Sequence, residues 1–153
     1  MNAPAPDPTS PSVPAPVARS AWGLLLGLLV ECVLGIGLNV SVQLPSSPSV
    51  TQVFLSIPLL TAHILIGFLL VIGSAFSWVL VRRTRVEGLG ARAGLVLVFV
   101  TLALVAGFAY VFTQTDAFAD GMAVAFVLAL ISQVLVLLRV RSAQRASSPA
   151  SAP

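Results

Sequence analysis

Charged side chains are scarce in this chain. Only 8% of its residues are charged, lysine is absent, and 58% are hydrophobic. The mean hydropathy is +1.03. So little polar surface cannot cover a globule in water, which excludes an ordinary soluble protein and indicates that lipid surrounds the chain. A length of 153 residues allows one compact bundle and no separate soluble domain of ordinary size.

Cysteine and histidine are almost absent too. Cys32 is the single cysteine, so no disulfide can form within the chain. One cysteine and one histidine, His63, cannot build a closed zinc site in a monomer, and we expect no metal. The sequence has no phosphate-binding glycine loop and no paired-carboxylate site. We therefore expect no catalytic residues and no enzyme.

Four long apolar runs dominate what is present. They cover residues 21–42, 56–81, 93–112 and 121–138. Each is close to the ~20 residues that a helix needs to cross a membrane, and none alternates with period two as a membrane strand does. The sequence predicts an all-α fold, with a four-transmembrane-helix bundle in residues 21–140. The Pro/Ala/Ser-rich segments 1–20 and 141–153 are expected to be disordered tails, because they have few large apolar side chains.

The basic residues are confined to one side of the predicted membrane. Links 43–55 and 113–120 contain none. The positive-inside rule therefore predicts a multi-pass protein of the cytoplasmic membrane with both termini in the cytoplasm. Because the arginines mark topology, the net charge of +3 does not indicate a nucleic-acid partner. The arginines are Arg19, Arg82, Arg83, Arg85, Arg92, Arg139, Arg141 and Arg145.

Apart from serine, threonine and aromatic residues, four polar side chains lie inside the predicted spans: Glu31, Asn39, His63 and Gln133. At about 1.5 Å per residue, Glu31 is near the midplane, and Asn39 and His63 are nearer the arginine-free surface. Consecutive helices are usually neighbours, so Asn39 and Glu31 are expected to bracket His63 in depth, and Glu31 can meet His63. An ionisable group at membrane depth is by default a hypothesis about function or about specific packing.

Glu31 has two interpretations at this stage. In the first it is neutral, donates a hydrogen bond to Asn39, His63 or a carbonyl group, and fixes the register of the bundle. In the second it binds a proton or a cation in a proton-coupled small transporter. A separate hypothesis concerns His63, which with Met122 at similar depth could ligate a b-type haem. Without haem, no cofactor is expected.

Small residues at four-residue steps form two ridges, one in the first span and one in the fourth. Such ridges allow close approach of helices in lipid. They favour packing within the bundle, or docking of a membrane-protein partner or a second copy. The favoured function is accordingly a non-enzymatic accessory or structural membrane component. The ridge residues are Gly23, Gly27 and Gly35, and Gly121, Ala125 and Ala129.

Two resemblances bear on family. The segment GLLVECVLGIGLN, with its lone Glu31, resembles the first helix of the small multidrug resistance transporters, which implies a coupling role for Glu31. The segments LGIGLNVSVQLP, TAHILIGFLLVIGS and TQTDAFADGMAVAFVLAL look like an uncharacterised family of small four-helix bacterial membrane proteins. Asn39, His63, Asp116 and Gly121 match that pattern, which implies the fold and no known activity.

Overall fold

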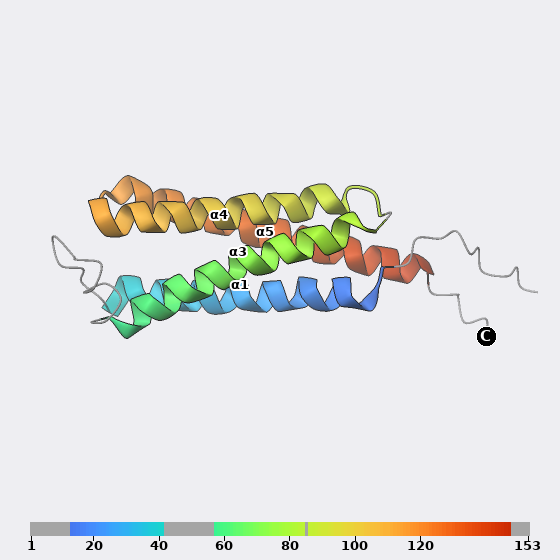
Figure 1. Cartoon of the computed structure of the whole chain (residues 1–153), viewed down its shortest axis with the longest axis horizontal. Coiled ribbons are helices and arrows are strands. Elements are labelled where there is room, and N and C mark those ends of the chain that lie inside the picture. The colour runs from blue at the N-terminus through green and yellow to red at the C-terminus, as the bar shows by residue number, and fades with distance from the viewer. Residues whose placement is uncertain (1–12, 42–56, 85, 148–153) are drawn as a thin grey trace, which may run out of the picture.

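The chain folds into four helices that run back and forth along one axis (Figure 1). The computed structural model describes residues 13–41, 57–84 and 86–147, and these ranges contain no strand. Each helix is long and apolar enough to cross a membrane, which confirms the predicted all-α four-helix bundle. The chain is therefore a multi-pass membrane protein by fold and composition. The helices are α1 Ala15–Ser41, α3 Pro58–Arg82, α4 Leu89–Thr113 and α5 Asp116–Ser147.

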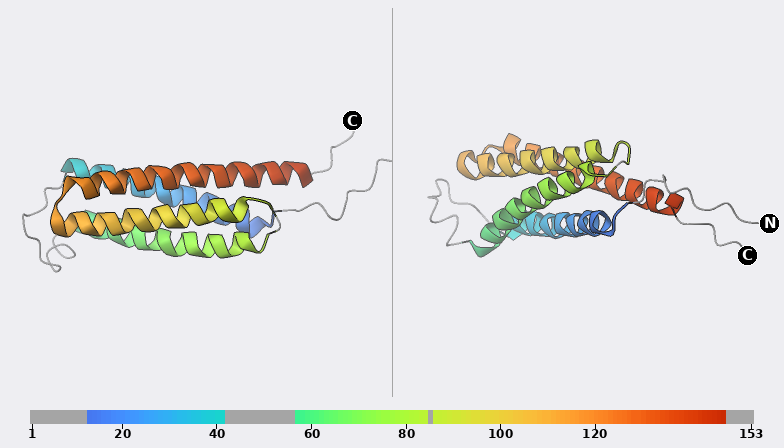
Figure 2. Two further views of the ribbon diagram at one scale, coloured as in Figure 1. Left: turned by 90° about the horizontal axis from the view of Figure 1, so that it is seen from above. Right: turned by 45° about the vertical axis from the view of Figure 1, so that its right-hand side comes forward.

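The helices form a ring in which each contacts two others. α1 packs on α3 and α5, and α4 packs on the same two helices. One end of the bundle, here called the arginine end, holds the starts of α1 and α4, the ends of α3 and α5, and every arginine that the structure describes (Figure 2). The other is the arginine-free end.

Local sequence signals set the helix boundaries. Pro58 is the first residue of α3, where a missing N–H costs nothing. Gly88 precedes α4 with a φ of 72°, a conformation that glycine adopts without strain. Gln114 ends α4 with a φ of 52°, and its N–H bonds to the carbonyl group of Tyr110.

Two helices extend into segments predicted as tails. α1 begins at Ala15 instead of residue 21, because Val13 and Val17 pack into the core at 8% and 3% exposure. α5 continues past residue 138 to Ser147, because Val140 is buried and Arg141 lies over the ring of Trp22. The tail interpretation is corrected for residues 15–20 and 141–147. Residues 1–12 and 148–153 lie outside the described part of the chain.

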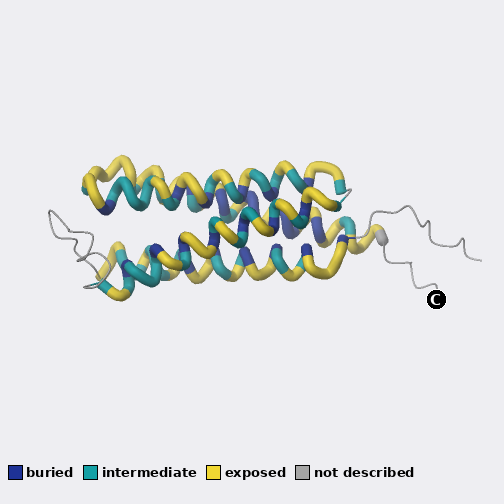
Figure 3. Tube along the Cα trace, in the orientation of Figure 1, coloured by how far each residue is buried: buried dark blue, intermediate teal, exposed yellow. Residues whose placement is uncertain are grey.

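The arginine half of the bundle is tightly packed. Its core contains Leu28 from α1, Val96 from α4 and Val136 from α5, all nearly inaccessible. Figure 3 marks the buried positions along the helices in dark blue. Within this half, the buried Gln133 of α5 donates a hydrogen bond of 2.6 Å to the carbonyl oxygen of Ala21 in α1. Buried polar contacts of this kind hold helices together in lipid. They join α1 to α5 at this end.

The arginine-free half is packed differently. Its apolar cluster consists of Leu60, Ile64 and Val111, flanked by Leu38, Ile57 and Phe108. These residues belong to α1, α3 and α4 or directly precede α3, so α5 supplies none of this cluster within the described residues. Figures 1 and 2 show the consequence: at this end α4 and α5 lie together, apart from α1 and α3.

Replacing Gly27 by leucine is expected to destabilise the bundle by about 2 kcal/mol, because added methylenes overpack a core. A Cβ atom at Gly27 would lie 2.9 Å from Cδ2 of the buried Leu70 on α3, whereas one at Gly23 would meet nothing within 4 Å. Gly23→Leu is the matched control and should be neutral or stabilising, since leucine is a better helix former than glycine. Thermal or denaturant unfolding in detergent measures both. Equal losses would contradict this packing.

Candidate functional site

A cavity of about 820 Å³ lies in the arginine-free half, between the two separated helix pairs. Volumes of roughly 300–1,000 Å³ are typical of small-molecule sites. All four helices contribute to its lining. The wall is mostly apolar, and its ionisable side chains among the described residues are Glu31, His63, Tyr110 and Asp120. A largely apolar cavity with a few convergent polar groups is the default binding-site hypothesis.

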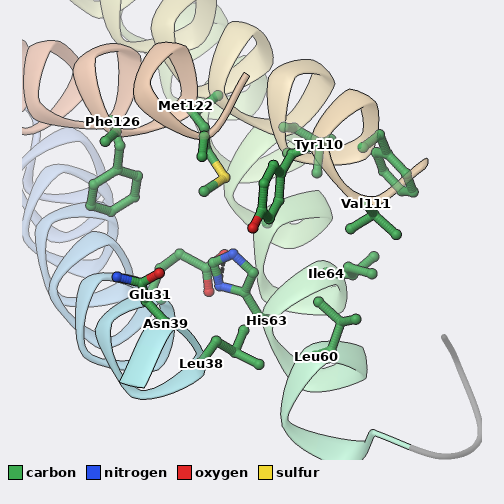
Figure 4. Close-up of a pocket in the computed structure, with 18 of the residues that line it drawn as sticks. Glu31, Leu38, Asn39, Leu60, His63, Ile64, Tyr110, Val111, Met122 and Phe126 are labelled. Atoms are coloured by element: carbon green, nitrogen blue, oxygen red, sulfur yellow. Dashed lines mark ion pairs between the residues drawn. The ribbon is translucent and has the colours of Figure 1, made fainter. Parts of the chain in front are cut away.

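Glu31 and His63 meet on the cavity wall. Nδ1 of His63 lies 3.0 Å from Oε1 of Glu31 (Figure 4). The side chain of Glu31 is 6% exposed and that of His63 is 20% exposed. The two groups are close but not aligned for a hydrogen bond, so His63 Nδ1 is buried without a hydrogen-bond partner. The second carboxyl oxygen of Glu31, Oε2, is also buried without one.

The unpartnered oxygen is the most informative atom in the site. Leaving a buried acceptor unsatisfied costs about 1–3 kcal/mol, and more for a charged group. A ligand that brings a hydrogen-bond donor to Oε2 removes that cost. The arrangement therefore favours a molecule with a donor group at the depth of Glu31.

Glycines bring α1 and α3 close enough for this pair. A Cβ atom at Gly35 would lie 3.5 Å from Cε1 of His63, and one at Gly67 would lie 3.4 Å from Oε1 of Glu31. A Cβ atom alone would make ordinary contact with the pair at these distances, whereas side chains larger than alanine at either position would press on it. Both glycines also line the cavity, so they shape the site as well as the helix contact.

Tyr110, Met122 and Phe126 face the pair from the other side of the cavity (Figure 4). The Tyr110 hydroxyl and the Met122 sulfur point toward the space above His63. The sequence predicts Met122 as a haem-ligand candidate and assigns no role in a site to Tyr110. The depth of Tyr110 in the membrane, counted along the sequence, is similar to that of His63. The direction in which the Tyr110 side chain points depends on the rotation of α4 about its axis, which the sequence does not give.

The remaining polar candidates have different roles. Asn39 is exposed and lines the edge of the cavity. Gln133 lies in the other half of the bundle, bonded to Ala21, and is no part of the site. Asp120 also lines the cavity, although the sequence assigns it no role in a site.

The small-residue ridges are largely used inside the bundle. Gly27 and Gly35 face α3, while Ala125 and Ala129 are buried. Gly23 and Gly121 have no atoms within 4 Å of an added Cβ. The ridges therefore offer a partner little continuous surface within the described residues.

The fold and the cavity define the class. The chain is a four-helix multi-pass membrane protein with a mostly apolar cavity in one half of the bundle, and Glu31 and His63 lie on the cavity wall. Comparison of the chain with protein-family models, curated proteins and solved structures found no match.

Proposed function

We propose that this protein is a proton-coupled carrier of a small amphipathic cation, which it binds in the cavity at Glu31 and His63. The observation that carries the proposal is the buried Glu31 carboxyl group, with one oxygen beside His63 and the other unpartnered. The arginines support a cytoplasmic position for the arginine end, with both termini inside. The cavity then lies in the outer half of the cytoplasmic membrane.

The charged side chains that line the cavity support a cationic ligand. Glu31 and Asp120 both line the cavity, whereas no arginine is among its described lining residues. His63 is its one group able to carry a positive charge, by gaining a proton. An acid would place a second negative charge beside the buried Glu31, and like charges repel strongly where the dielectric constant is low. The site therefore disfavours carboxylates and phosphates.

The rest of the wall suits the apolar part of such a ligand. Phe108, Tyr110 and Phe126 line the cavity with aromatic surface. A cation near an aromatic face gains about 0.5–2 kcal/mol. The same surface covers methylene groups. An ammonium or guanidinium head with a short hydrocarbon body matches both features.

The proton exchange balances in charge. In the proposed exchange, Glu31 and His63 without ligand share one proton, and the pair has no net charge. When a cationic ligand binds the carboxylate, the pair releases that proton to water, and the pair with its ligand again has no net charge. Proton and ligand thus compete for the same pair of side chains, and competition of this kind couples the flow of one to the flow of the other.

Binding of octylguanidinium should strengthen with pH, by up to about tenfold per pH unit while the ligand displaces one proton. This probe has N–H donors and stays charged, as the arginine guanidinium does. Its own charge is thus constant across the pH range. Equilibrium binding to the protein in lipid nanodiscs, with empty nanodiscs subtracted, measures the effect.

Octanoate, which has the opposite charge and a similar chain, is the control ligand. It should show no specific binding above empty nanodiscs. Octylguanidinium affinity that is independent of pH, or octanoate bound equally well, would overturn the proposal.

The haem hypothesis has two observations in its favour. Glu31 stands behind Nδ1 of His63, as carboxylates often do behind metal-ligating histidines, and Met122 faces the same space. The lining nevertheless does not fit haem. Its two propionates are anionic, and the cavity offers them Glu31 and Asp120 but no arginine among the described lining residues. We therefore assign the cavity to an organic cation.

A further inference from the structure

The contact between α1 and α5 changes character along the bundle. In the arginine half, Gln133 bonds to Ala21, and Arg141 lies 4.8 Å from the centre of the Trp22 ring. Beyond Glu31 toward the arginine-free end, no described residue of α1 is buried. On α5, Ala125 is the one buried residue between Asp116 and Leu128. The two helices are thus joined at one end and separated at the other.

The opposite side of the cavity, between α3 and α4, is closed. Phe68 and Phe108 pack with their ring centres 5.8 Å apart. Leu60 and Ile64 of α3 share a buried cluster with Val111 of α4. The opening is therefore on the α1–α5 side.

Side chains along the open side line the cavity and are also accessible from outside. Ile36 of α1 lines it and is 62% exposed, and Ala123 of α5 lines it and is exposed. In a helix that crosses a membrane, exposed apolar residues at this depth contact lipid. The cavity thus meets the hydrocarbon region along this seam. We name the seam the α1–α5 portal: Gly35, Ile36 and Asn39 on α1, with Ala119, Ala123 and Phe126 on α5.

We infer that the ligand reaches the cavity sideways from the bilayer through the α1–α5 portal, and that it is a membrane-dissolved amphiphile with one hydrocarbon chain. This inference rests on the proposed function for the identity of the head group. The head lies at Glu31 and His63, and the chain extends past Ile36 and Ala123 into lipid. Polar groups deep in the cavity and portal residues that are small or apolar, apart from Asn39, match this head-first orientation.

A tryptophan reporter tests whether lipid chains reach the cavity. The cavity reporter is Tyr110→Trp in a protein whose Trp22 and Trp78 are changed to phenylalanine. It is placed in vesicles of phosphatidylcholine brominated in the middle of its acyl chains. We expect quenching comparable to that of a Val105→Trp reporter, since Val105 is 59% exposed on the lipid-facing side of α4. Quenching of the cavity reporter by aqueous iodide and not by brominated lipid would overturn the portal.

A matched pair of variants tests the position of the opening. Ala123→Phe fills the portal and should reduce quenching of the cavity reporter at least twofold. Val124→Phe is the control, because Val124 is 60% exposed beside it but does not line the cavity. Equal quenching in both variants would place the lipid path elsewhere and overturn the inference. The assay contains no ligand, so a failure of octylguanidinium binding would count against the proposed function and not against the portal.

Discussion

Uptake of octylguanidinium into proteoliposomes is expected to fall to the rate of protein-free vesicles when Glu31 is replaced by glutamine. Glutamine keeps the size of the side chain but removes the negative charge that binds the cation. A hydrogen bond to a charged group contributes about 1.5–3 kcal/mol, which corresponds to a loss of affinity of roughly 100-fold at its upper end. Because the carboxylate also belongs to the pair that holds the exchanged proton, the pH dependence of uptake should disappear with it.

Asp120→Asn is the matched control for this loss. It removes the other carboxyl group that lines the cavity, but Asp120 is exposed, so its charge is screened by water. Uptake should fall less than about fivefold, because exposed ion pairs contribute only about 0–1 kcal/mol. If Glu31→Gln retains uptake, or if both variants lose it equally, Glu31 is not the coupling group.

Replacement of His63 by leucine is expected to destabilise the folded protein by about 3 kcal/mol. The change leaves the buried Glu31 carboxyl group without its neighbour, 3.0 Å away, and an uncompensated buried charge costs about 3–5 kcal/mol. Polar groups can enter the cavity beside Glu31 and compensate part of its charge. The expected loss of stability is therefore at the lower end of this range. Denaturant unfolding in mixed micelles measures the difference.

The double variant with Glu31→Gln and His63→Leu tests whether the two effects are coupled. Residues in direct contact show interaction energies of about 0.5–3 kcal/mol in such cycles. The double variant should therefore be more stable than the sum of the single losses predicts. Additive losses would mean that the two side chains do not interact in the folded protein.

The sequence predicts the helices well and the cavity poorly. Four apolar runs determine the number and type of elements, because chain length across a membrane and hydrogen-bond satisfaction leave few alternatives. The predicted start of α1 and end of α5 are wrong, since Val17 and Val140 are isolated apolar residues in polar segments and are buried only through tertiary packing.

The contact between Glu31 and His63 could be anticipated from depth and from the adjacency of consecutive helices. The cavity around it could not. It arises because α5 contacts α1 near Gln133 and separates from it beyond Glu31, and helix crossing leaves no periodic signal in the sequence. For the same reason, the roles of Tyr110, Asp120 and Phe126 as lining residues appear only in three dimensions.

The number of protons released per bound octylguanidinium tests the central claim most directly. A pH indicator in weakly buffered solution, with the protein in nanodiscs, records the release as the ligand is titrated to saturation. At a pH where the pair of Glu31 and His63 holds its proton, the wild-type protein should release close to one proton per ligand, and Glu31→Gln should release none. Saturable binding without proton release, or the same release from both proteins, would contradict the assignment of Glu31 and His63 as a shared site for proton and cation.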